Sequence, residues 1–352
     1  MAILYGLLSE KDLYASRVTE SGVMVRDVVE SIRMSVAEHN RGLNALLGLF
    51  ARRTTDFKTR FTTPAAARLQ PLDSSGRALP IKPSGVYDVS NPLQMAGLSW
   101  GHDYVTGVKM TVGEAANYTM TLLDGDTRWM RDHLLAALFV DGSWTFTDPL
   151  HGTLTVKGLA SGDTDTYNVL SGADTGATDD HVKGAGSITA SVFTDIRDEL
   201  KEHPENSGEV VVLVPTASRA TVEGLTGFYE RTDANLLLGT GSTRLVGNLD
   251  VAVPGEVFGY IEGCWVVEWR SMPANYLIGV TTGGEKVLSL REDPEAQLRG
   301  FHEVARRDDH PWYERQYLRR AGFGAWNRVG AIVYKTDNAT YAVPTGYSSP
   351  MP

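Results

Sequence analysis

The sequence predicts an α+β fold, and two observations carry the prediction. Apolar residues recur at helical spacings of three, four and seven over residues 25–50 and again over 112–140. Between and after these stretches, short β-prone pieces are separated by prolines, glycines and polar turns. With 352 residues, of which 42% are apolar, the chain is long enough for about two domains around a real core.

The first helix is expected over residues 25–50, with an interruption near Gly42. Its apolar stripe precedes a region that has little core of its own. The helix is therefore interpreted either as an arm that packs on a neighbouring molecule or as a helix packed on its own domain.

Residues 54–111 change character. Short β-prone pieces at 57–63, 85–89 and 104–110 alternate with five prolines, which are Pro64, Pro71, Pro80, Pro83 and Pro92. The pattern predicts a long, irregular, two-stranded excursion. Since long structureless loops are uncommon inside compact domains, this excursion is expected to rest on another surface.

A second helix is predicted over residues 112–140, about 40 Å long if unbroken. Thr111 is the expected N-cap, and Glu114 stands three residues later, as in a capping box. The step Asp124-Gly125-Asp126 is unfavourable inside a helix and argues against continuity. A helix of this length suits a spine better than a globular core.

The rest of the chain reads as hairpins followed by alternating helices and strands. Apolar alternation at Trp144 and Phe146, and at Leu154 and Val156, predicts one or two hairpins within 141–186. Helices are then expected at 191–203 and 218–229, and strands at 209–215, 256–261, 265–269 and 276–281. A final strand pair is predicted at 330–336 and 339–344.

Composition excludes several classes of protein. The longest apolar run has seven residues, too short to cross a membrane, and the N-terminus lacks the basic region of a signal peptide. The single cysteine, Cys264, allows no intramolecular disulfide and is expected to be a small core residue. A net charge of -10 argues against a surface devoted to nucleic acid.

Residues 291–328 carry eight arginines, seven acidic residues and no lysine. Arginine suits planar, bidentate ion pairs at packed contacts. This segment is therefore predicted to stabilise subunit contacts rather than to bind DNA, with Arg319 and Arg320 as the best candidates. The alternative is that both side chains are simply solvated.

No catalytic, cofactor-binding or metal-binding residue is predicted. The segment Gly97-Leu98-Ser99-Trp100-Gly101 matches a nucleophile elbow, but no strand-to-helix turn is expected around Ser99. The glycines at 239–242 and 283–284 lack the rest of a nucleotide-binding motif and read as turns. Asp163 and Asp165, and the run 308–310, do not match a metal-binding loop.

The order of the expected elements resembles the major capsid protein of tailed bacteriophages, the Hong Kong 97-type shell fold that encapsulins share. The closest textual similarity lies in LSLREDPEAQLRGFHEVARRDDHPWYERQYLRRAGFGAWNRVGAIVYKTDNATYAVP, which looks like the stretch that returns from the axial to the peripheral domain. Pro215-Thr216-Ala217-Ser218 resembles the turn from a strand into an axial-domain helix.

The resemblance implies a division of the chain. Residues 1–53 would form an N-terminal arm, and 54–111 an extended β-hairpin loop. Residues 112–190 would form the peripheral domain, with the spine helix and a hairpin elaboration. Residues 191–300 would form the axial domain, and 301–352 would return to the peripheral domain with a C-terminal hairpin.

The resemblance also implies a function. The chain would be a structural protein, not an enzyme, that assembles into hexamers and pentamers of an icosahedral virion shell enclosing double-stranded DNA, without sequence-specific binding. It would assemble in the host cytoplasm, away from membranes and without cofactors. Expected partners are a separate scaffolding protein, a portal and a decoration protein. An encapsulin-type shell around a cargo enzyme is the alternative, and a serine hydrolase using Ser99 is a more distant one.

Overall fold

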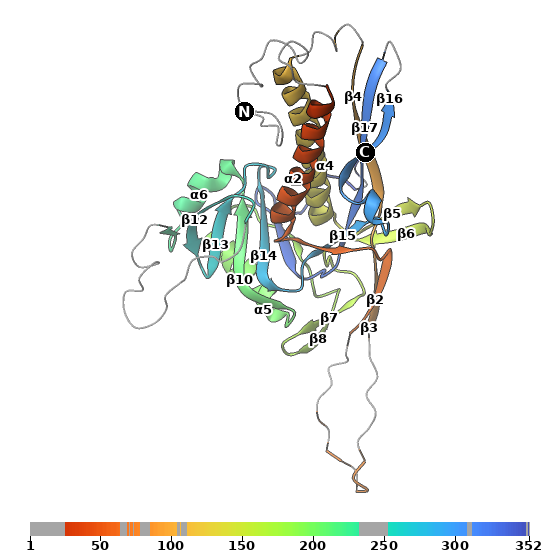
Figure 1. Ribbon diagram of the computed structural model, residues 1–352. Coiled ribbons are helices and arrows are strands. Elements are labelled where there is room, and N and C mark those ends of the chain that lie inside the picture. Colours follow the sequence, from red (N-terminus) through yellow and green to blue (C-terminus); the bar gives the residue numbers. More distant parts are fainter. Residues whose placement is uncertain are drawn as a thin grey trace. The chain divides into compact units, whose positions relative to one another are not determined.

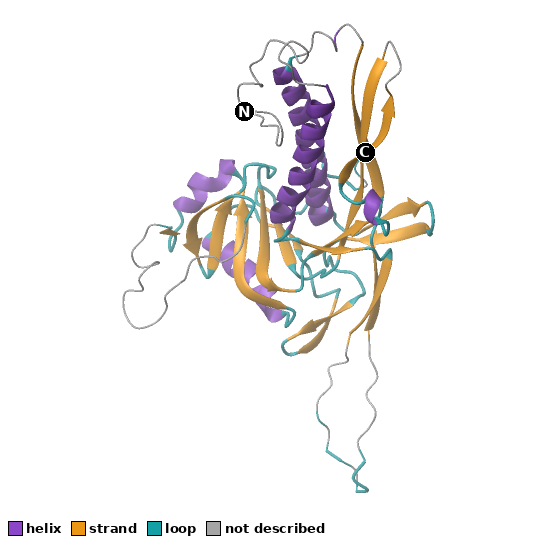
Figure 2. Cartoon of the chain, viewed as in Figure 1, coloured by secondary structure: helices purple, strands orange, loops and turns teal. Residues whose placement is uncertain are grey.

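The computed structural model describes residues 25–63, 69, 71–72, 74–77, 85–103, 106, 111–231, 253–307, 312–349 and 351. The chain divides into two compact units, shown as ribbons in Figures 1 and 2. Unit 1 comprises Met1–Leu47, Leu93–Leu134 and Arg291–Gly322, and unit 2 comprises Gly48–Pro92, Leu135–Leu290 and Phe323–Pro352.

Unit 1 combines two helices with a three-stranded antiparallel ladder. Its helices are α2 (Val25–Leu47) and α4 (Val112–Phe139), the latter up to Leu134. Strand β17 (Trp312–Ala325) pairs on one side with β4 (Gln94–Asp103) and on the other with β16 (Phe301–Arg307). The helices lie side by side (Figure 1) and share an apolar cluster with the strands. Its buried members are Ile32, Val36, Trp100, Ala115, Ala116, Leu122, Phe301 and Tyr317.

Helix α4 begins with the predicted capping box and runs without a break. The hydroxyl of Thr111 accepts the backbone N–H of Glu114 at 3.2 Å, and the Glu114 carboxylate accepts the Thr111 N–H at 2.8 Å. The expected weakness at Gly125 has a packing reason. A Cβ there would lie 2.6 Å from a methyl carbon of Leu98, so glycine lets strand β4 approach the helix closely.

Unit 2 is built on a seven-stranded sheet in the order β11-β12-β13-β10-β14-β18-β9. Helix α5 (Ala190–Glu202) packs on it through Phe193, Ile196 and Leu200, and Figure 2 shows helices beside these strands. The strands are β9 (Val182–Gly184), β10 (Asn206–Val214), β11 (Tyr229–Glu230), β12 (Glu256–Ile261), β13 (Cys264–Glu268), β14 (Tyr276–Gly284) and β18 (Ala331–Lys335). Strand β10 runs parallel to β13 and antiparallel to β14.

Three two-stranded ladders complete unit 2. They are β2 (Lys58–Thr63) with β3 (Gly85–Ser90), β5 (Ser143–Asp148) with β6 (Gly152–Lys157), and β7 (Thr166–Val169) with β8 (Gly172–Thr175). Trp144 faces Val156 and Phe146 faces Leu154, so the predicted alternation is confirmed. Strand β1 (Ala51–Thr54) is next to β15 (Leu288–Glu292) in a different sheet, whose order is β1-β15-β17-β16. The short helices of unit 2 include η1 (Thr216–Ser218) and α6 (Arg219–Glu223), and η2 (Ala296–Leu298) lies in unit 1.

Several predicted helices need correction. Helix α2 continues through Gly42, and its residues Ile32 and Val36 pack on α4 within unit 1. The helix therefore packs on its own unit, which is the second of the two interpretations that the sequence left open. The helix predicted at 218–229 is confined to α6. Within the described ranges, no helix has an apolar stretch long enough to span a bilayer.

The predicted C-terminal hairpin is wrong. Strand β18 is almost fully buried, and it pairs with β14 and β9 instead of with the residues that follow it. Residues 339–349 contain no strand. That segment is held by side chains, since the Tyr341 hydroxyl donates to Phe139 O and the Tyr276 hydroxyl donates to Ala342 O. The large sheet thus takes β9 and β18 from outside the predicted range 191–300.

The expected excursion is confirmed at its base. Strands β2 and β3 pair over their full length, from Lys58 with Ser90 to Thr63 with Gly85. The expected strand at 104–110 falls mostly outside the described residues. Strand β4 precedes that stretch and joins the ladder of unit 1.

Gly279 offers a test of how tightly unit 2 is packed. A Cβ at this position would lie 2.3 Å from Cγ2 of Ile196 and 3.0 Å from Cγ2 of Ile332. We expect Gly279→Ala to lower the free energy of unfolding by about 1–3 kcal/mol, because the core must shift to admit the methyl group. Urea unfolding of the purified chain measures this effect. Gly186→Ala is the control, since nothing lies within 4 Å of the Cβ added there; equal effects of the two variants would contradict the packing argument.

Candidate functional site

A deeply buried charge pair of unit 1 joins helix α4 to strand β17. The Arg319 guanidinium donates to both carboxylate oxygens of Asp126, at 2.5 and 2.6 Å. Arg319 is 5% exposed and Asp126 is 3% exposed. A bidentate pair in this setting is short and directional, so it fixes the position of one element against the other.

Two residues of α2 extend this pair into a network. His39 Nε2 lies 2.7 Å from the Asp126 carboxylate. The side-chain oxygen of Asn40 accepts a hydrogen bond from Arg319 at 2.9 Å. The same side-chain amide donates to the backbone carbonyl of Phe301, the first residue of β16, and accepts its backbone N–H. Helix α2, helix α4 and both strands thus meet at one polar centre inside an otherwise apolar unit.

The network sets the charge of Asp126. Burial alone would raise the pKa of this carboxyl, but the bonds from His39 and Arg319 outweigh burial and lower it below its ordinary value. Asp126 is therefore ionised at neutral pH and balances the charge of Arg319.

The prediction for Arg319 and Arg320 needs correction. Both arginines do form ion pairs, but the partners lie in the same chain and the same unit. Arg319 pairs with Asp126, and Arg320 pairs with the buried Asp293. Sequence reasoning identified the type of interaction but placed it at subunit contacts.

A second buried arginine organises the hairpin region of unit 2. Arg328 is 2% exposed, and its guanidinium reaches Gly158 O at 2.8 Å and Leu159 O at 3.2 Å. It also pairs with Asp163 and Asp165, each at 2.5 Å, and contacts the hydroxyl of Tyr167. The two aspartates considered as calcium ligands therefore bind an arginine instead.

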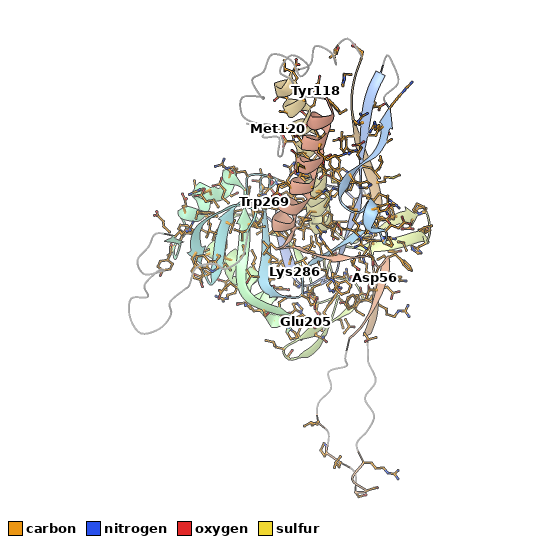
Figure 3. All side chains as sticks on the ribbon, viewed as in Figure 1. Asp56, Tyr118, Met120, Glu205, Trp269 and Lys286 are labelled. Carbon is orange, nitrogen blue, oxygen red and sulfur yellow. The ribbon has the colours of Figure 1, made fainter. Side chains whose placement is uncertain are left out.

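The base of the two-stranded extension is anchored by aromatic rings. Phe61 stacks on Tyr87 with centroids 5.2 Å apart and meets the Trp326 ring edge-on at 4.8 Å. A cavity of about 190 Å³ lies beside these rings, with Glu205 in its lining; Figure 3 labels Glu205. On the ladder, Arg60 and Lys58 both pair with Asp88. These contacts anchor the base of the β2–β3 ladder within unit 2.

Three potential metal ligands converge inside unit 2. His181 Nε2 lies 3.0 Å from Asp179 Oδ1 and 3.2 Å from His203 Nε2, and His203 Nε2 lies 3.7 Å from Asp179 Oδ1. All three residues are at most 1% exposed. The sequence analysis did not identify them, because His203 is far from the Asp179-x-His181 pair along the chain.

The remaining candidate residues have structural positions. Ser99 lies within strand β4, opposite Gln316, so no strand-to-helix turn holds it as a nucleophile. Cys264 is buried, which raises the pKa of its thiol to about 12. Gly284 ends β14 with φ of +81°, as expected of a turn. The runs 239–242 and 308–310 lie outside the described residues.

Comparison with known proteins rests on structure. No family model matches the sequence, and no curated protein does. A solved structure from Mycobacterium phage Patience matches with a TM-score of 0.69 and 17% identity, covering 98% of this chain and 97% of that one.

Two solved phage capsids match more distantly. The capsid of Ralstonia phage GP4 gives a TM-score of 0.51 at 10% identity, over 86% of this chain and 88% of that one. The mature capsid of bacteriophage PhiM1 gives 0.50 at 9% identity, over 84% and 88%. The chain therefore has a fold of tailed-phage capsid proteins, and the predicted α+β class and the resemblance of fold are confirmed.

Removing Arg319 tests the polar centre of unit 1. We expect Arg319→Ala to lower the free energy of unfolding by about 3–5 kcal/mol, because it leaves Asp126 charged and buried without its main partner. Arg33→Ala is the matched control, since Arg33 pairs with Glu303 but its side chain is 51% exposed; its loss should stay below about 1 kcal/mol. Urea unfolding gives both values, and similar losses would show that burial does not strengthen the Arg319 pair.

The same carboxylate predicts a pH dependence. Since the folded-state pKa of Asp126 is lowered, its contribution is complete above the unfolded value of about 3.9 and is lost as pH falls through the folded value. The difference in melting temperature between the wild type and Asp126→Asn should therefore narrow from neutral pH to about pH 3. Calorimetry at several pH values measures it. A difference that stays constant would mean that Asp126 acts through packing and not through its charge.

Proposed function

We propose that this chain is the major capsid subunit of a tailed bacteriophage, which assembles as hexamers and pentamers into an icosahedral shell around double-stranded DNA. One observation carries the proposal. The structural match to the Patience protein spans nearly the whole of both chains, and two further matches are capsids by description.

The surface of each unit supports an assembling protein. Large apolar side chains stand exposed on unit 1, among them Met34, Met95, Leu98, Tyr118 and Met120. Tyr118 and Met120 are labelled on α4 in Figure 3 and are 42% and 41% exposed. In unit 2, Leu150 and Leu170 are 82% and 75% exposed. Each would gain stability from burial against another subunit, at roughly 25 cal/mol per Å² of apolar area.

The parts of such a subunit can be assigned to the described elements. We assign the β2–β3 ladder to the base of the extended loop, and α4 to the spine helix. The seven-stranded sheet with α5 and α6 corresponds to the axial domain, and the ladder of β4, β16 and β17 to the peripheral domain. The N-terminal arm would comprise residues 1–53, which include α2.

The partners follow from this role. The packaged DNA would be enclosed without sequence-specific contacts, and the net charge of -10 would keep the shell wall from holding it tightly. A scaffolding protein, a portal and a decoration protein are the expected protein partners. The subunit would assemble in the host cytoplasm and end in the virion.

No observation favours the alternatives. The strand position of Ser99 argues against a hydrolase of the nucleophile-elbow type. Nothing in the described residues points to a cargo-docking surface of the encapsulin kind.

Electron microscopy of the chain, produced in bacteria with the products of its neighbouring genes, tests the proposal. We expect closed shells of uniform diameter with fivefold vertices, because closed shells are the assembled form of this fold in the matched capsids. Particles produced in the phage host should also protect DNA from nuclease. A chain that stays monomeric under both conditions would overturn the proposal, and uniform shells that contain a host enzyme but no DNA would assign it to the encapsulin class.

A further inference from the structure

The buried triad of Asp179, His181 and His203 has the arrangement of a metal site. Asp179 and His181 immediately precede β9, and His203 follows the last residue of α5. All three belong to unit 2, and among the described residues they are the group of three whose ligand atoms converge within 4.8 Å.

Backbone carbonyls fix which ring nitrogen of each histidine carries the proton when the ring is neutral. His181 Nδ1 lies 2.9 Å from Ala331 O, and His203 Nδ1 lies 2.8 Å from Asn168 O. A carbonyl oxygen can only accept, so each Nδ1 carries the proton and donates it. In the neutral rings, each Nε2 therefore presents a lone pair. An Nδ1–H donated to a backbone carbonyl is the usual second-shell contact of a metal-bound histidine.

The Asp179 carboxylate at this centre lacks a hydrogen-bond partner. Neither carboxylate oxygen of Asp179 accepts a hydrogen bond, although both are fully buried. With both rings neutral, the Asp179 carboxylate and the two Nε2 lone pairs face one another among fully buried side chains, where an uncompensated charge is very costly. A positive charge at the centre would remove that cost.

The distances between the three ligand atoms match those around a tetrahedrally coordinated zinc ion. With zinc–ligand bonds of about 2.0–2.1 Å, the ligand atoms of a tetrahedron lie about 3.3–3.4 Å apart. The three observed separations are 3.0, 3.2 and 3.7 Å, which bracket this value. Glu202 lies outside this converging group: its carboxylate oxygen is 3.9 Å from His203 Nε2 and its side chain is 46% exposed, so it would have to move to become a fourth ligand.

We propose that Asp179, His181 and His203 bind a structural divalent zinc ion. Two imidazole nitrogens and one carboxylate suit zinc, and their burial suits a closed structural site rather than a catalytic one with an open position. The ion would join the segment before β9 to the end of α5, and through the second-shell bond of His181 to the start of β18. Its binding free energy would add to the stability of the folded chain.

Metal analysis of the full chain tests this proposal. The chain is produced without a histidine tag, purified without chelator, dialysed against zinc and then against buffer. We expect about one zinc per chain by mass spectrometry, a lower melting temperature after chelation, and recovery when zinc is restored. Cobalt(II) in place of zinc should give the visible absorption of tetrahedral nitrogen and oxygen coordination.

Variants locate the ion. Asp179→Asn and His203→Gln should reduce bound zinc to a small fraction of the wild-type amount. Asp148→Asn and His133→Gln are matched controls that should retain it, because both residues are buried and bond to the backbone away from the triad. If a ligand variant fails to fold, the metal content, chelator response and cobalt spectrum of the wild type decide. A wild-type chain that binds no zinc or cobalt and melts unchanged in chelator would overturn the proposal, as would variants of the triad that keep the ion.

Discussion

The buried pair of Arg319 and Asp126 is the constraint on which unit 1 depends. Compared with apolar residues of the same volume, such a pair adds little net stability, but losing one partner is expensive. Its effect is therefore one of position: β17 can sit against α4 only where the guanidinium meets the carboxylate. His39 and Asn40 bring α2 to the same point, and Asn40 in turn holds the first residue of β16.

Unit 2 uses arginine in a similar way, and its contacts give a physical reason for arginine rather than lysine at position 328. Arg328 satisfies two backbone carbonyls, two carboxylates and a hydroxyl while almost fully buried. A guanidinium has five donors in a fixed plane, whereas an ammonium has three around a point. Lysine at this position would leave acceptors unpaired in the interior, where each costs about 1–3 kcal/mol.

Local features were predictable from the sequence, because they depend on neighbours along the chain. The capping box of Thr111 and Glu114, the alternation of the β5–β6 hairpin and the strands around β10 all belong to this group. The errors concern contacts between distant residues. The sequence predicts that β18 pairs with the segment after it, because periodicity does not reveal which distant strands are its neighbours. In the structure, β18 lies between β14 and β9.

The buried polar clusters cannot be predicted from the sequence for the same reason, because their members are distant along the chain. Asp126 stood next to Gly125 in a step that looked unfavourable for a helix, and only the positions of Leu98 and Arg319 explain both residues. The zinc ligands are similar, since Asp179-x-His181 has no meaning until α5 delivers His203. Local rules thus fail where the fold places its charged groups, and such conflicts in a sequence are worth reading as signs of long-range contacts.

The hairpin region of unit 2, residues 141–186, has little apolar core and is held in place by buried charged and polar groups. Its own apolar cluster is small, with Ala160, Tyr167 and Val329 as its buried members, and small pieces with little core need additional fastening. Arg328 lies just before β18 in the chain and pairs with Asp163 and Asp165. His181 bonds to the carbonyl of Ala331, the first residue of that strand. The contacts of Arg328 and of His181 both connect the hairpin region to the beginning of β18, whose own residues pair with β14 and β9 in the large sheet. A segment with too little apolar area to hold itself in place is thereby given the rigidity of the strand to which it is tied.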